Sequence, residues 1–95
     1  MRDLTELRNE IDRIDHELVR LFEARMNTVR EVAAYKKAHN LPVLNTGREA
    51  EVIAKGTALL EDPAFAPSLA KWMEYTMALS RASQEEQLAQ PEGAC

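Results

Sequence analysis

Basic side chains interrupt an apolar helical stripe in the N-terminal part of the chain. At about 100° of rotation per residue, one narrow face of that helix collects Ile11, Leu18, Phe22 and Val29. Arg25 and Lys36 fall in the same sector, and Arg8 and Asp15 lie at its edge. Cationic donors on a face that should be dry indicate a pocket for an anionic ligand.

The energetic argument for a ligand is the surplus of positive charge. A buried charge without a partner costs several kcal/mol as an order of magnitude, and Asp15 can compensate only one of the three cations. The alternative is that the long side chains run along the apolar surface and keep their charged ends in water. Three cations on one stripe favour the ligand.

Spacing along the helix separates the three cations into two groups. Arg25 and Lys36 are about 16 Å apart along the axis, so their side chains can lean together around a small molecule. Arg8 is about 25 Å from Arg25, too far to share that molecule within one chain. If Arg8 acts at the same site, it must do so across an interface between two antiparallel copies.

Polar residues also occur at unexpected places further along the chain. Ser80 and Gln84 are one helical turn apart on a partly apolar stripe, although polar residues near a helix end are commonly just solvated. Arg48 lies in line with apolar residues of a second helix. Glu49 has a structural explanation, because it stands three residues after Thr46 and is expected to complete a capping box there.

Three helices and no strand are expected to position these residues. Asp3 is the expected N-cap, and the apolar spacing predicts one helix from about Leu4 to His39. A loop over 40–45 contains Pro42, which disfavours helix at the residue before it. The remaining expected boundaries are a helix from Thr46 to about Leu60, a break at Glu61-Asp62-Pro63, and a helix with Pro67 in its first turn that ends near Ala89.

The length of the first helix predicts an intertwined, two-fold homodimer. About 35 residues at 1.5 Å each give a helix roughly 50 Å long. A compact chain of 95 residues has a radius of gyration near 12 Å and cannot cover such a helix. Two copies packed along each other would bury both stripes. A simple coiled-coil module is the alternative that periodicity alone leaves open.

Composition excludes several classes of function. The chain has 45% hydrophobic residues and a net charge of −4, which argues for a globular domain and against a nucleic-acid surface. It has no apolar run long enough for a membrane helix and no expected signal peptide, so a cytoplasmic protein is expected. His16 and His39 lie on different faces, Cys95 is the single cysteine, and no phosphate loop is present. We therefore expect chemistry without cofactor, metal or covalent nucleophile.

An ordered set of motifs resembles the all-helical chorismate mutases. The set comprises the run from Leu7 to Asp15, Arg25, Lys36 within Tyr35-Lys36-Lys37-Ala38, Pro42-Val43, Arg48-Glu49, and Ser80 with Gln84. The resemblance covers about residues 4–88. It assigns residues 1–90 to a chorismate mutase-like helical domain and leaves 91–95 as a flexible C-terminal tail.

The resemblance implies an activity and a role for each matching residue. The reaction is the Claisen rearrangement of chorismate to prephenate on the route to phenylalanine and tyrosine, in an intertwined dimer with two active sites. Arg25 and Arg8 of the partner subunit would hold the two carboxylates, and Lys36 and Gln84 would donate to the ether oxygen. The other matched residues would bind substrate: Arg48 and Ser80, with Glu49 and the backbone around Asn45 meeting the ring hydroxyl. Asn45 stands where that family more usually has Asp.

Three other functions remain open from the sequence. An isochorismate pyruvate-lyase has the same fold, although Arg48-Glu49 after the loop favours the mutase. A mutase acting on aminodeoxychorismate is kept open by Asn45. The third is a non-catalytic helical dimerisation module, which Arg25, Lys36 and Gln84 oppose because an interface alone would be expected to carry Leu or Ile there.

Overall fold

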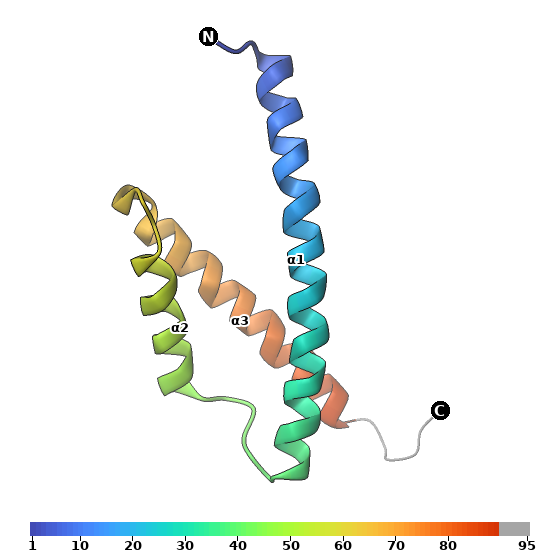
Figure 1. The fold of residues 1–95 in the computed structure, drawn as a ribbon. Helices are drawn as coiled ribbons and strands as arrows, with labels where there is room; N and C mark the ends of the chain where they lie inside the picture. Colours follow the sequence, from blue (N-terminus) through green and yellow to red (C-terminus); the bar gives the residue numbers. More distant parts are fainter. Residues whose placement is uncertain (90–95) are drawn as a thin grey trace.

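Three α-helices make up almost all of the structure, a computed structural model that describes residues 1–89. The elements are α1 (Leu4–Ala38), α2 (Thr46–Ala58), the short 3-10 helix η1 (Pro63–Phe65) and α3 (Ala66–Ala89), and no strand occurs among the described residues. The prediction of an all-helical fold with one very long N-terminal helix is confirmed (Figure 1). The expected tail, 91–95, lies outside the described residues.

The ends of α1 follow from local hydrogen bonds. Asp3 is the N-cap as predicted, and its carboxylate accepts from the backbone N–H of Glu6 at 2.8 Å. At the other end, α1 stops at Ala38, one residue before the predicted His39, which is the C-cap. Asn40 then adopts a left-handed φ of 54°. The backbone N–H of Leu41 then donates to Lys36 O at 2.8 Å, which completes a Schellman turn. This turn reverses the direction of the chain and brings Leu41 next to Lys36.

The start of α2 differs from the prediction. Asn45, not Thr46, is the N-cap, and its side-chain oxygen accepts from the backbone N–H of Arg48 at 3.0 Å. Thr46 is already the first helical residue, so the predicted capping box between Thr46 and Glu49 is wrong. Asn45 takes the N-cap position because Asn is among the best N-cap residues, and here its backbone has the extended conformation that a cap requires.

The link between α2 and α3 is longer than predicted. Helix α2 ends at Ala58, two residues before the predicted Leu60, where the N–H of Leu59 donates to Gly56 O. Asp62 caps η1 through the N–H of Ala64, and α3 follows directly. The third helix has the expected Pro67 in its first turn and continues to Ala89, the last described residue.

Helix α3 holds the chain together, because it packs against both α1 and α2. Figure 1 shows α3 crossing the C-terminal half of α1, with α2 alongside α3. The buried residues described are few: Val29, Ala33, Met77, Ser80 and Gln84. Two of them lie on α1 and three on α3, so the interior of a single chain is the crossing of these two helices.

The N-terminal half of α1 has no cover from its own chain. It extends away from α2 and α3 in Figure 1, and its apolar side chains are exposed: Leu4, Leu7, Ile11, Ile14, Leu18, Leu21 and Phe22. The radius of gyration is 17.0 Å, against about 12 Å for a compact chain of this length. Helix α1 is thus too long to be covered by one chain, as predicted. No helix within 1–89 is long and apolar enough to cross a membrane.

Candidate active site

A cavity of about 170 Å³ lies where the three helices and the loop after α1 meet. Seven of the eight residues that the resemblance assigns to the site line it: Arg25, Lys36, Asn45, Arg48, Glu49, Ser80 and Gln84. Valines of α1, α2 and the loop, together with Met77, form the apolar part of the wall. The structure thus brings together residues from Arg25 to Gln84 that are distant in the sequence.

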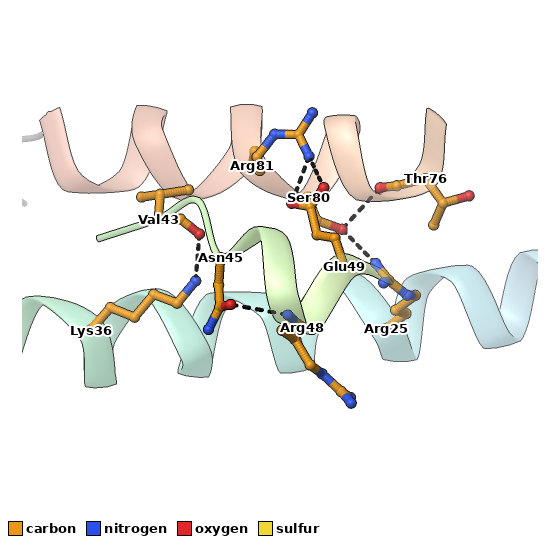
Figure 2. Close-up of polar contacts among 9 residues, drawn as sticks. All are labelled: Arg25, Lys36, Val43, Asn45, Arg48, Glu49, Thr76, Ser80 and Arg81. Carbon is orange, nitrogen blue, oxygen red and sulfur yellow. Dashed lines mark hydrogen bonds and ion pairs between the residues drawn. The ribbon is translucent and has the colours of Figure 1, made fainter. Parts of the chain in front are cut away.

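Arg25 is fixed by Ser80 across the crossing of α1 and α3. The Ser80 hydroxyl donates to Thr76 O at 3.0 Å and accepts from Arg25 Nη1 (Figure 2). Ser80 is only 6% exposed, so its polar position is not that of a solvated residue near a helix end. Because the buried hydroxyl donates its proton to the backbone, its oxygen is left as an acceptor for Arg25. This hydrogen bond holds the guanidinium at the cavity wall.

Lys36 reaches the cavity through two neutral acceptors. Its ammonium donates to Val43 O at 2.8 Å and to Gln84 Oε1 at 3.0 Å. The turn at Asn40 makes the first bond possible, because it brings the loop back over Lys36 (Figure 2 shows the contact with Val43). Since Gln84 accepts through its oxygen, its amide nitrogen remains a donor, so Lys36 and Gln84 offer two donors side by side.

On α2, Asn45 and Arg48 line the cavity in different ways. The Asn45 side chain is engaged as the helix cap. The Arg48 side chain is 59% exposed, and its guanidinium pairs with Glu51 Oε1 at 2.6 Å on the same helix. In Figure 2 it points away from Glu49 and Arg81. Hydrogen bonds from Lys55 and Arg48 hold the pKa of Glu51 below its ordinary value. Arg48 therefore lines the cavity as a cation that is already paired with Glu51.

Glu49 pairs with a residue that the sequence reasoning missed. Arg81 Nη1 of α3 donates to both carboxylate oxygens of Glu49, with 2.6 Å to Oε2, and both side chains line the cavity. Glu49 therefore joins α2 to α3 rather than capping α2. The signal for Arg81 was present, because it stands four residues after Met77 and three before Gln84 and so shares their face.

Arg8 is the one predicted residue that the structure does not bring to the cavity. It is exposed on the uncovered part of α1, seventeen residues before Arg25. That separation is about 25 Å along a continuous helix, as the sequence predicted. Within one chain the site therefore consists of residues from Arg25 onward.

The charge of the cavity favours an anion. Its lining carries four cations and one carboxylate, and two of these cations have described carboxylate partners, Arg81 in Glu49 and Arg48 in Glu51. Arg25 and Lys36 therefore account for the surplus of positive charge. The hydrogen-bond partners described for Arg25 and Lys36 are all neutral oxygens. Within 1–89 no group of three His, Cys, Asp or Glu residues could hold a metal ion.

Comparison with known proteins assigns the family. A family model described as chorismate mutase type II matches residues 7–85, most of the chain. The chain belongs to the chorismate mutase type II family. The match spans every residue singled out in the sequence, from Arg8 to Gln84, so the resemblance identified from the motifs is confirmed.

Two curated proteins each contain a segment that is similar to a little more than half of this chain. The bifunctional chorismate mutase/prephenate dehydratase of Aquifex aeolicus is 42% identical over 55 residues, which are 58% of this chain and 15% of that protein. The T-protein of Haemophilus influenzae is 43% identical over 49 residues, 52% of this chain and 13% of that protein. The chain thus matches only a small part of either relative's length. No solved structure gives a significant match.

The cap at Asn45 makes a stability prediction. Asn45→Ala removes the acceptor for the Arg48 N–H and should cost about 1 kcal/mol, whereas Asn45→Asp keeps the cap and should change little. Thermal unfolding followed by circular dichroism measures both variants. Equal losses in the two variants would contradict a capping role, because they would show that the side-chain oxygen is not the feature that matters.

Proposed function

We propose that this chain is a chorismate mutase, an isomerase that converts chorismate to prephenate for phenylalanine and tyrosine biosynthesis without a cofactor. The observation that carries the proposal is the pair of partly buried cations, Arg25 and Lys36, held at the cavity by neutral oxygens alone. Their charge is uncompensated by these partners and suits a ligand with two carboxylates. Membership of the chorismate mutase type II family supports this substrate.

The reaction suits a site of this composition. A Claisen rearrangement is unimolecular and needs no acid, base or nucleophile. It needs the substrate folded into a chair-like conformer, and donors aimed at the ether oxygen on which charge develops. In the proposal Arg25 holds a carboxylate, and the neighbouring Lys36 ammonium and Gln84 amide donate to the ether oxygen. Ser80 fixes Arg25, while Glu49 and the start of α2 at Asn45 lie where the ring hydroxyl would bind.

The proposed working unit is a homodimer in the cytoplasm. The exposed apolar face of α1 supports a second copy as its cover, since an uncovered stripe of this length is unfavourable in water. Such a dimer would bring Arg8 of the partner subunit toward the cavity, where it would hold the second carboxylate. Arg48, released from Glu51, would add a further cation for substrate binding.

A non-catalytic dimerisation module fits the site less well. Ser80 and Gln84 are each 6% exposed and engage cations, while much larger apolar side chains stay exposed. A fold that served association alone would gain by filling the α1–α3 crossing with apolar residues. The isochorismate pyruvate-lyase alternative is separated from the mutase by its products.

The activity is tested directly with chorismate. The purified protein should remove the ultraviolet absorbance of chorismate and yield prephenate, whereas salicylate and pyruvate from isochorismate would indicate the lyase.

Lys36→Ala should lower kcat by about 10²-fold or more, because it removes a donor to the ether oxygen. Lys71→Ala removes an exposed lysine of α3 outside the cavity and should keep wild-type turnover. Equal activity of the two variants would refute the role of Lys36.

Gln84→Glu should make the activity depend on pH. A carboxylate cannot donate a hydrogen bond, but a protonated carboxyl group can. Activity of the variant should therefore rise as the pH falls from about 8 toward 4, because an ordinary Glu has a pKa of about 4.3. Gln84→Ala is the control and should lose activity without this dependence. Full activity with a flat profile in Gln84→Glu would exclude contact between residue 84 and the ether oxygen.

Mixing inactive variants tests whether two chains share a site. Arg8→Ala and Lys36→Ala chains, unfolded together and refolded at equal amounts, should recover about a quarter of the wild-type activity, since half of the dimers are mixed and each holds one intact site. Lys36→Ala with Gln84→Ala is the control and should recover none, because these side chains bond within one chain. Equal recovery in the two mixtures would contradict a role for Arg8 across the interface.

A further inference from the structure

Arg81 and Glu49 form an ion pair in the wall of the cavity. Figure 2 shows Arg81 reaching from α3 to Glu49 on α2, and one nitrogen, Nη1, donates to both carboxylate oxygens. The two side chains are 31% and 26% exposed, so the pair is more shielded than the other ion pairs described. Because solvent screens it less, each partner has a strong effect on the charge that a ligand meets.

This pair divides the cavity into two electrostatic halves. On the α1 side, Arg25 and Lys36 contact neutral oxygens and keep their full positive charge. On the α2–α3 side, the charge of Glu49 is balanced by Arg81, and Arg48 is paired with Glu51. A ligand that suits both halves carries its anionic groups toward α1 and an uncharged hydrogen-bonding group toward Glu49.

We propose that Arg81 is a positioning and specificity-determining residue, which neutralises Glu49 and so makes the site select a ring hydroxyl over a ring amino group. The inference rests on the proposed function, in which Glu49 meets the ring hydroxyl of chorismate. It separates chorismate from aminodeoxychorismate, whose amino group on a saturated carbon carries a proton near pH 7.

The selection follows from the charge of the pair. A carboxylate has about four acceptor positions, so Glu49 can hold Arg81 and still accept a hydrogen bond from a hydroxyl. An ammonium group at the same place would gain little from a carboxylate that Arg81 already balances, and it would lie near the positive charge of Arg81. Without Arg81 the unbalanced carboxylate would attract the ammonium group, whereas its repulsion of the two substrate carboxylates is the same for both compounds.

The experiment compares the two substrates in three variants. For the wild type and each variant, kcat/KM is measured with chorismate and with aminodeoxychorismate. Arg81→Met should shift the ratio about tenfold or more toward the amino compound, because Glu49 is left charged. Arg81→Lys keeps the positive charge and should retain the preference for chorismate. Arg81→Met combined with Glu49→Gln removes both charges and should return the ratio toward that of the wild type.

The ratio distinguishes charge selection from a loss of structure. Damage to the fold would lower the kcat/KM of both substrates together and would not be reversed by Glu49→Gln. An unchanged ratio in Arg81→Met, or the same shift in the single and the double variant, would overturn the inference. Thermal unfolding of each variant, followed by circular dichroism, accompanies the assay.

A binding measurement separates this inference from the proposed function. In the Lys36→Ala background, where turnover is slow, calorimetry gives the affinity for each compound with and without Arg81→Met. A shift of the affinity ratio toward the amino compound supports the inference even if the wild type fails to convert chorismate, which would overturn the mutase proposal alone. An unchanged affinity ratio, or no binding of either compound, would overturn the inference.

Discussion

The crossing of α1 with α3 is the contact on which the rest of the chain depends. Its apolar part is small, since it consists of Val29, Ala33 and Met77, and Ala33 is fully buried. Hydrogen bonds from Arg25 to Ser80 and from Lys36 to Gln84 flank it. Hydrogen bonds between a cation and a neutral oxygen stabilise the fold less than apolar packing of the same area, because the neutral oxygen does not fully offset the cost of removing the charge from water. Their value lies in holding two cations in fixed positions at a cavity.

The length of α1 leaves much of its apolar surface uncovered within a single chain. A helix of 35 residues buries only its C-terminal half against α3 and leaves apolar side chains such as Leu18 and Phe22 exposed. Removal of apolar surface from water is the main favourable contribution to folding, so such a face gains by association. In the proposed dimer the length of α1 serves two purposes, since it provides the interface and carries Arg8 far from its own cavity.

The arrangement of charges suits catalysis by position rather than by chemical participation. The described residues of the cavity hold no nucleophile-base pair, and its cations have neutral partners that orient them without cancelling their charge. Donors fixed before the substrate arrives do not have to reorganise as charge develops, which is the main source of rate enhancement at such sites. The turn at Asn40 and the cap at Asn45 contribute indirectly, because the turn brings the loop with Val43 to Lys36 and the cap starts α2 at the cavity.

Much of this protein was determined by its sequence alone. The 3.6-residue period of apolar positions identified the three helices, and Asp3 and Pro67 located two of their starts, because capping and proline geometry are local effects. Cations on an apolar face identified Arg25 and Lys36, since burial of charge is visible in the pattern itself. Tertiary structure decided what depends on contacts between helices. Glu49 could not be told from a capping residue by spacing, and it pairs with Arg81 instead of Thr46 only because α2 and α3 lie side by side. A helix cap depends on hydrogen bonds among residues a few positions apart, so it can be predicted from the local sequence. An ion pair between two helices depends on how the helices pack.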